Sequence, residues 1–289
     1  MLWFILSLLT AFFESMKVIA SKRSLKLSGI DEYVVAWSLR IFALPFLLPL
    51  LLFVDMPAIG NAFLIALSAG GLLNVAATIL YMRAIKLSDI SVAYPMITFT
   101  PLFMLITSPL ILSEFPSISG IIGILLIVFG SYVLNMGERG NGVLSPFRSL
   151  LKEKGPRLML LVAFIWSITA NIDKVGVLNS NPLFWIISVN LFVSSVMFPI
   201  AYLKIGRDAA RIPRNVKALI PIGLFSALLL IFQMTAITMT LAAYVISVKR
   251  TSAIISVILG AVVFKERNLR GRLAGAVMMV LGVLFITLL

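Results

Sequence analysis

Apolar residues occur along this chain in runs of about twenty, separated by short polar segments. A run of this length is what a transmembrane helix needs to cross a hydrocarbon layer roughly 30 Å thick. The pattern predicts ten spans, with boundaries good to a few residues. They are 2–20, 33–54, 61–82, 90–112, 117–136, 157–177, 183–203, 217–239, 243–264 and 272–289. The sequence therefore predicts an all-α integral membrane protein.

The overall composition supports this interpretation. Of the 289 residues, 61% are hydrophobic and 12% are charged, and soluble domains carry about twice that charged share. A soluble fold of this size could not bury so much apolar surface. The first run has no basic segment before it, so we expect a retained span and not a cleaved signal peptide.

The sequence contains no cysteine and no histidine. Thiolate metal sites, thiol nucleophiles and the commonest general base are therefore missing. No glycine-rich segment ends in Gly-Lys-Ser/Thr, so an ATP-binding loop of that type is not expected. An enzyme acting on lipid would need catalytic residues clustered at one membrane surface, and the spans suggest no such cluster. We expect no enzymatic activity, no cofactor and no metal.

The two halves of the chain align without gaps when the sequence is shifted by 152 positions. The matches at charged and glycine positions are Lys22 with Lys174, Glu114 with Glu266, Gly123 with Gly275, and Gly130 with Gly282. Each half holds five spans, and because five is odd the second half must enter the membrane upside down. Inverted repeats of this kind are typical of transporters that work by alternating access. The predicted organisation is a five-helix repeat over 1–136, a connecting loop over 137–156, and an inverted repeat over 157–289.

Basic residues are concentrated in every second loop. All but five of the 24 Lys and Arg residues lie in the odd-numbered loops, and the even-numbered loops have none. The positive-inside rule then places the odd-numbered loops in the cytoplasm and both termini outside, in a cell membrane. The net charge of +13 is explained by these loops and by contacts with lipid headgroups. Nucleic acid is not an expected partner.

Two short patterns recur in register within the repeat. They are Ser113-Glu114 with Gly123 and Gly130, matched by Lys265-Glu266-Arg267 with Gly275 and Gly282, and the pair Lys22 and Lys174. With them, essentially the whole chain resembles the EamA-type ten-helix members of the drug/metabolite transporter superfamily. The resemblance implies ten helices around a central cavity and carriage of small metabolites. Members are often described with both termini in the cytoplasm, which is opposite to the orientation that the loop charges predict here.

Apart from Arg157, Lys217 and Arg272, which are the first residues of their spans and are counted with the loops, seven charged residues lie inside the predicted spans. They are Lys17, Arg40, Lys174, Lys249 and Arg250, with the acidic Glu14 and Asp173. A charge near the bilayer centre costs several kcal/mol, so such residues usually face a cavity or pair with each other. The excess of basic residues means that internal pairing cannot neutralise them all. We expect Asp173 to pair with Lys174 near the outer end of its span, with Lys174 reaching toward the interface.

Lys249 and Arg250 form the most distinctive feature, because they lie well inside the ninth span. Small polar residues surround them at Ser247, Thr251 and Ser252. The planar fork of Arg and the compact charge of Lys suit a carboxylate or phosphate. A similar Lys-Arg pair binds phosphate in the plastid sugar-phosphate branch of the superfamily, so the resemblance implies an anionic substrate group. The alternative is that the pair neutralises Glu14 and Asp173 and stabilises helix packing.

Glu14 and Lys17 lie three residues apart on the first span, so they share a face and could form a pair. Glu14 is also the best candidate for a proton-coupling carboxylate. Arg40 could serve the same anion or contact a headgroup. The full candidate binding set is Lys249, Arg250, Glu14, Lys17, Arg40, Asn74, Tyr81, Tyr94, Gln233 and Trp166. For the uncharged members, hydrogen bonding or packing between helices is the alternative.

Prolines mark places where spans could bend. They are Pro45, Pro49, Pro95, Pro101, Pro109, Pro199 and Pro221. Together these features predict a secondary active transporter, an exporter or an exchanger, for a small polar metabolite with an anionic group. Its expected partners are that substrate, membrane lipids and protons, and both a monomer and a homodimer are compatible with the sequence. The alternatives are an exporter of amino acids or cationic drugs in which the Lys-Arg pair is structural, and a non-transporting assembly protein.

Overall fold

A computed structural model describes residues 1–28, 32–87, 94–136, 153–205, 211–256, 258 and 270–288, and none of these lies in a strand. The helices are α1 (Leu2–Ser28), α2 (Glu32–Ile41), α3 (Leu44–Leu47), η1 (Leu48–Phe53), α4 (Phe63–Leu87), η2 (Tyr94–Phe99), α6 (Thr100–Leu112), α7 (Ile118–Met136), α9 (Lys154–Leu178), α10 (Pro182–Ile205), α11 (Arg211–Ile237), α12 (Ala242–Lys249) and α14 (Arg270–Leu288). The elements η1 and η2 are 3₁₀ helices.

Seven segments within the described ranges are helical, long and apolar enough to cross a membrane. They are Leu2–Ser21, Ala36–Phe53, Phe63–Ala84, Pro95–Leu112, Lys154–Leu178, Pro182–Leu203 and Leu219–Ile237. Two shorter apolar helices are Ile118–Leu134 and Leu273–Leu288. Large apolar side chains cover the outside of the bundle, among them Ile65, which is 74% exposed, and Leu110, which is 79% exposed. An apolar exterior suits contact with lipid and confirms a multi-pass membrane protein.

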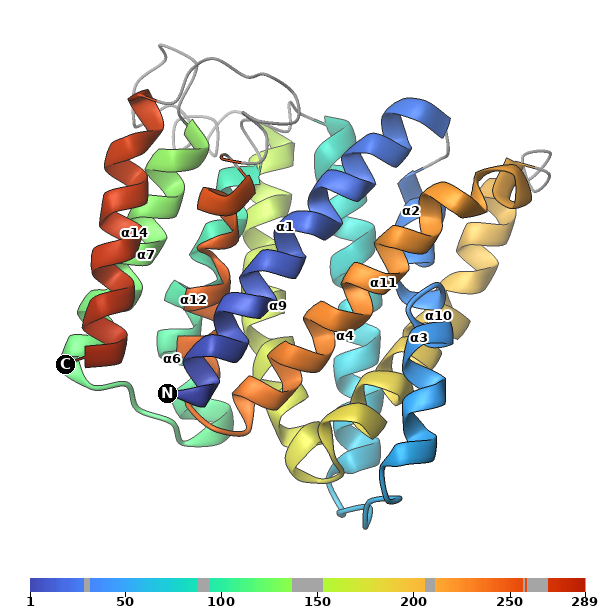
Figure 1. Cartoon of the computed structure of the whole chain (residues 1–289), viewed down its shortest axis with the longest axis horizontal. Coiled ribbons are helices and arrows are strands. Elements are labelled where there is room, and N and C mark those ends of the chain that lie inside the picture. Colours follow the sequence, from blue (N-terminus) through green and yellow to red (C-terminus); the bar gives the residue numbers. More distant parts are fainter. Residues whose placement is uncertain are drawn as a thin grey trace.

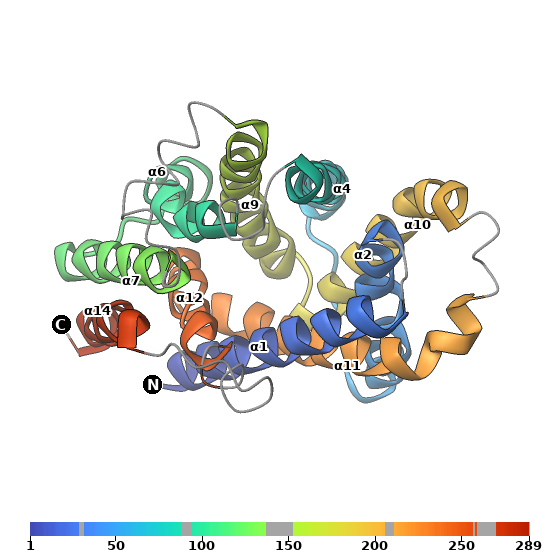
Figure 2. The ribbon, with the colours of Figure 1, turned by 90° about the horizontal axis from the view of Figure 1, so that it is seen from above.

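The helices pack as neighbouring pairs. α1 packs mainly against α11, α4 against α9, α2 against α10, and α7 against α14. Seen from above, α7 and α14 occupy one end of the bundle and α2 and α10 the other, with α6 and α12 between α7 and the centre (Figure 2). Both termini lie toward the lower end of the view in Figure 1, the end that also holds the turn between α11 and α12.

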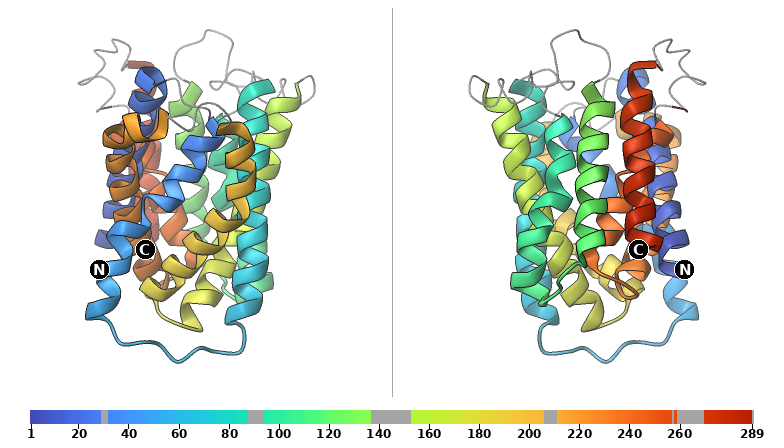
Figure 3. Two further views of the ribbon diagram at one scale, coloured as in Figure 1. Left: turned by 90° about the vertical axis from the view of Figure 1, so that its right-hand side faces the viewer. Right: turned by 90° about the vertical axis from the view of Figure 1, so that its left-hand side faces the viewer.

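α7 and α14 lie side by side (Figure 3, right), and four glycines let their backbones come into contact. A Cβ at Gly123 would lie 2.6 Å from the carbonyl oxygen of Gly282, and a Cβ at Gly282 would meet Gly123 at 2.6 Å. Gly130 and Gly275 face each other in the same way. A Cβ at Gly130 would lie 2.6 Å from the carbonyl oxygen of Gly275, and a Cβ at Gly275 would lie 2.5 Å from that of Gly130. Membrane helices gain no hydrophobic driving force from association, so close van der Waals packing at small residues stabilises such a pair instead.

Prolines interrupt the second and fourth spans. α2 ends at Ile41 because Pro45 has no N–H to donate to the carbonyl oxygen of Ile41, and because its ring would clash with that carbonyl group. The second span continues through α3 into η1, where Pro49 lies near the start. In the fourth span Pro95 lies in η2, and α6 begins only at Thr100. By contrast, Pro109, Pro199 and Pro221 are contained within continuous helices.

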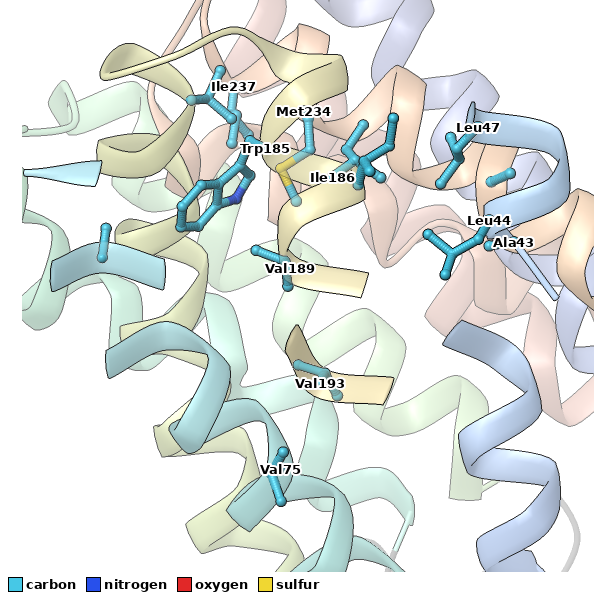
Figure 4. Close-up of a cluster of buried hydrophobic side chains, with 14 of the residues drawn as sticks. Ala43, Leu44, Leu47, Val75, Trp185, Ile186, Val189, Val193, Met234 and Ile237 are labelled. Carbon is cyan, nitrogen blue, oxygen red and sulfur yellow. The ribbon is translucent and has the colours of Figure 1, made fainter. Parts of the chain in front are cut away.

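A buried apolar cluster fills the space between α2, α3, α10 and α11. Trp185 is fully buried and lies beside Ile186 of α10 and Met234 and Ile237 of α11 (Figure 4). Gly176 of α9 allows the indole ring to approach, because a Cβ there would lie 2.3 Å from ring carbons of Trp185. This cluster fixes the orientation of Trp185, whose ring nitrogen contacts a charged residue described below.

Candidate functional site

The helix is interrupted at the Lys-Arg pair, in the segment that the sequence predicts as the ninth span. α12 ends at Lys249, Arg250 and Thr251 form a turn, and the chain is helical again over 252–256. The turn has bonds of the 3₁₀ type, from the N–H of Arg250 to the Ser247 carbonyl at 2.9 Å and from the N–H of Thr251 to the Val248 carbonyl at 2.9 Å. No proline causes this break. A local change of helix geometry within a helix often marks a hinge or a functional site.

Glu14 of α1 faces this break. Its Oε2 atom accepts a hydrogen bond from Lys17 at 2.9 Å and lies 3.5 Å from the Nζ atom of Lys249. Arg250 also contributes to the electrostatic field at Glu14. These ionic side chains are only about one-fifth exposed, at 17% for Glu14 and 20% for Lys249. One carboxylate therefore faces several cations in a partly dehydrated place.

Two further contacts hold this group together. Lys249 donates a hydrogen bond to Oε1 of Gln233 on α11 at 2.9 Å. The buried hydroxyl of Ser15 donates to the carbonyl oxygen of Ser252 at 2.8 Å, which connects α1 to the segment that follows the break. We call Glu14, Lys17, Gln233, Lys249 and Arg250 the ninth-span cluster.

A second charged group lies between α2, α4, α9 and α10. Arg40 donates to Oδ1 of Asn74 at 3.5 Å, and the indole N–H of Trp185 donates to Oδ1 of Asp173 at 3.0 Å. Asp173 lies within electrostatic range of Arg40 and of Lys249. The two groups therefore share one electrostatic environment in the interior of the bundle.

The predicted aromatic candidates also come together in part. The rings of Tyr81 on α4 and Trp166 on α9 stack, with centroids 5.9 Å apart and planes at 30°. The side chain of Tyr94 lies outside the described residues. Asn74 makes a second bond, to the Gly70 carbonyl at 2.9 Å, so its amide serves its own helix as well as Arg40.

The pairing expected between Asp173 and Lys174 is wrong. Lys174 forms its ion pair with Glu114, at the end of α6, and is 8% exposed, so it does not reach out to the interface. Asp173 points instead toward Trp185. Neighbouring residues on a helix point about 100° apart, so the two charges face different partners. The side chains of Lys22 and Glu266, their counterparts in the repeat, lie outside the described residues.

Sequence reasoning missed a buried polar contact between α6 and α9. Ser108 donates to Oδ1 of Asn171 at 2.8 Å, and the amide of Asn171 donates to the hydroxyl of Thr107 at 3.0 Å. Asn171 and Ser108 are fully buried. The available signal was the position of Asn171, one helical turn before Lys174 on the same face of an apolar helix.

A surface groove of about 410 Å³ lies elsewhere on the molecule, between α6 and α9. It is lined by Phe103, Arg157, Leu160, Leu161 and Phe164. Phe164 is 41% exposed, and none of the ninth-span cluster lines this groove. It faces the surroundings of the bundle and is not where the interior charges gather.

Comparison with known proteins identifies the family. The model of the EamA-like transporter family matches residues 1–136 and 154–288. The chain belongs to the EamA-like transporter family. This confirms the resemblance seen in the sequence and makes the chain a member of a family of membrane transporters.

The fold of this EamA-like chain also occurs among solved structures. One, titled only "Crystal structure of protein", superposes with a TM-score of 0.76 over 99% of this chain and 96% of its own, at 13% sequence identity. At that identity the likeness shows a shared fold and nothing about substrate. A comparison with curated proteins gave no match.

Proposed function

We propose that this chain is a secondary active transporter that carries a small polar metabolite with a carboxylate or phosphate group by alternating access. The observation that supports it best is the break of the ninth span at Lys249 and Arg250, next to Glu14 and Gln233. Inside a membrane, irregular backbone is tolerated only within protein or beside a water-filled path. Broken helices form the binding sites of many secondary transporters.

The balance of charge favours an anionic substrate. The two interior groups contain four cations, Lys17, Arg40, Lys249 and Arg250, against the two carboxylates Glu14 and Asp173. A substrate with one or two negative charges would neutralise the excess. Glu14 binds two of the ammonium groups, and an anionic substrate would compete with it for them.

The helix packing supports ten spans in two inverted halves. Shifted by 152 positions, the bounds of α7 become 270–288, which are those of α14. The contact between α1 and α11 corresponds under the same shift to that between α9 and α4, and both are extensive. The bounds of η2, shifted by the same 152 positions, become 246–251, and this range contains the break of the ninth span. Matched breaks in matched helices are what a pseudo-two-fold axis through the substrate site would produce.

The test is counterflow into liposomes containing the purified protein. Labelled inorganic phosphate, small phosphate esters, dicarboxylates, amino acids, sugars and organic cations would be compared. We expect uptake of an anion that is lost in Lys249→Ala/Arg250→Ala. The matched control is Lys154→Ala/Arg157→Ala, which removes the same charge from exposed positions at the start of α9 and should leave uptake unchanged.

A second candidate function has one observation in its favour. Lys249 already has two partners, Glu14 and Gln233, so a purely structural role for the Lys-Arg pair is coherent. In that case the protein would export amino acids or cationic compounds. Uptake of a neutral or cationic solute that survives Lys249→Ala/Arg250→Ala would overturn the anion proposal in favour of this one.

We also propose that the odd-numbered loops face the cytoplasm and that both termini lie on the outer side of the membrane. The support is the loop charge asymmetry together with the position of both termini toward one end of the bundle (Figure 1).

A further inference from the structure

Glu114 lies just after α6, in a turn that directs its carboxylate inward. Ser113 takes the left-handed conformation with φ 54°, and its N–H bonds to the Pro109 carbonyl at 3.1 Å. A left-handed residue at this position ends a helix and reverses the chain direction. As a result, only 13% of the Glu114 side chain is exposed.

The carboxylate of Glu114 contacts two other elements. Its Oε1 atom pairs with Nζ of Lys174 on α9, and its Oε2 atom accepts the N–H of Ala242 at 3.0 Å. Ala242 is the first residue of α12, and Leu241, which precedes it, offers no side-chain cap. Glu114 therefore caps α12 from the turn that follows α6. Its negative charge interacts favourably with the free N–H groups and with the positive end of the helix dipole.

Lys174 contacts the same place from the other side. Its ammonium donates to the Thr240 carbonyl at 2.6 Å, in the turn between α11 and α12. Lys174 and Glu114 together thus contact both sides of the junction at which α12 begins. We call these two residues the clamp.

The clamp lies at one end of α12, and the ninth-span cluster lies at the other. α12 has eight residues, so at about 1.5 Å per residue it is roughly 12 Å long. A short rigid helix carries any displacement of its first residue to its last. The position of Lys249 therefore depends on the contacts of Ala242.

We propose that Glu114 and Lys174 are positioning residues that hold α12 where Lys249 and Arg250 reach the substrate. The inference rests on the proposed function, since it gives α12 a role in binding. It explains why two charges are retained at a buried helix junction, where apolar residues would pack at lower cost. It also assigns a task to the Glu at the end of the fourth span, which the repeat pattern singled out without explaining.

The first experiment measures the position of α12 without any substrate, using the absence of cysteine in the chain. Ser247 of α12 is fully buried, so a Ser247→Cys thiol should react slowly with N-ethylmaleimide. In Glu114→Ala or Lys174→Met we expect the labelling rate to rise about tenfold or more, because a charge-assisted hydrogen bond is lost. Lys174→Arg keeps the charge and should stay near the parent rate.

The control separates movement of α12 from general loosening. Ser194 of α10 is also buried, at 4% exposure, and does not contact the clamp. A Ser194→Cys thiol should label at the same slow rate in every background. Equal acceleration at both positions, or no acceleration at Ser247→Cys, would overturn the proposal.

The second experiment measures transport of the anion that wild-type counterflow identifies. Glu114→Gln keeps an acceptor for the Ala242 N–H but loses the ion pair, and we expect a raised half-saturation concentration with a maximal rate near wild type. Glu114→Ala should raise the half-saturation concentration further. An unchanged half-saturation concentration in both variants would contradict the positioning role. If no anion is transported at all, the proposed function fails while the labelling experiment still decides how α12 is held.

Discussion

At the scale of single residues, the spacing of Glu14 and Lys17 predicted their ion pair, and the structure confirms it at 2.9 Å. Residues three apart on a helix are neighbours whatever the rest of the fold does. The approach of Lys249 to the same carboxylate depends on how α1 and α12 pack, which periodicity does not encode. The Asp173–Lys174 expectation failed because adjacency in sequence was taken for adjacency in space.

Because two lysines share the carboxylate of Glu14, substituting Glu14 should destabilise the fold more than substituting Lys17. Glu14→Gln leaves Lys17 and Lys249 as unbalanced positive neighbours, whereas Lys17→Gln leaves Glu14 still close to Lys249. We expect Glu14→Gln to lower the free energy of unfolding by about 2 kcal/mol and Lys17→Gln by less. Thermal unfolding in detergent, followed by tryptophan fluorescence, measures both.

The same pair of variants tests whether a bound anion takes the place of Glu14. A transported anion should raise the melting temperature of Glu14→Gln more than that of wild type, since a ligand stabilises the state it binds. Equal destabilisation by Glu14→Gln and Lys17→Gln would mean that the contact between Lys249 and Glu14 does not contribute to stability.

At the scale of helices, most elements could be predicted from runs of apolar residues. The break of the second span after Ile41 follows from Pro45, which removes one backbone donor. The break at Lys249 could not be predicted in this way, because no proline causes it. Its only signal was a run of polar side chains from Lys249 to Ser252 in an otherwise apolar span.

The glycines of α7 set a limit on side-chain size in the α7–α14 contact. In Gly130→Ala the new methyl group would meet the Gly275 carbonyl oxygen at 2.6 Å, and backbone cannot move aside cheaply. We expect a loss of about 1–3 kcal/mol, the usual cost of overpacking, less the gain in helix propensity. Thermal unfolding in detergent is the measurement.

Gly120 on the same helix provides the matched control. Its added methyl group would meet the Tyr244 hydroxyl, the far end of a side chain that can rotate away. Gly120→Ala should therefore cost less than Gly130→Ala. The opposite order would mean that the α7–α14 backbone contact is not limiting.

At the scale of the whole molecule, the multi-pass bundle and the family were both predictable, because bilayer thickness imposes the length of each apolar run. The location of the charged interior groups was predictable only as a list of candidates. Bringing Arg40, Asp173 and Trp185 together requires three helices from both halves to meet. Such contacts depend on the arrangement of the helices, and a single sequence does not specify it.

The orientation in the membrane can be measured with single cysteines. Met56, in the second loop, is 75% exposed, and Lys154 at the start of α9 is also exposed. In intact cells we expect a membrane-impermeant maleimide to label Met56→Cys at once and Lys154→Cys only after lysis. The reverse pattern would place both termini in the cytoplasm.

The reciprocal contact of α7 and α14 has a consequence for one half of the chain taken alone. Gly123 meets Gly282, and Gly282 aligns with Gly130 when the sequence is shifted by 152 positions. Two copies of α7 alone, placed antiparallel, would therefore set Gly123 of each against Gly130 of the other, as in an isologous dimer. If the two halves are the inverted repeat proposed above, a five-helix chain inserted in both directions would form this same interface between two of its own copies.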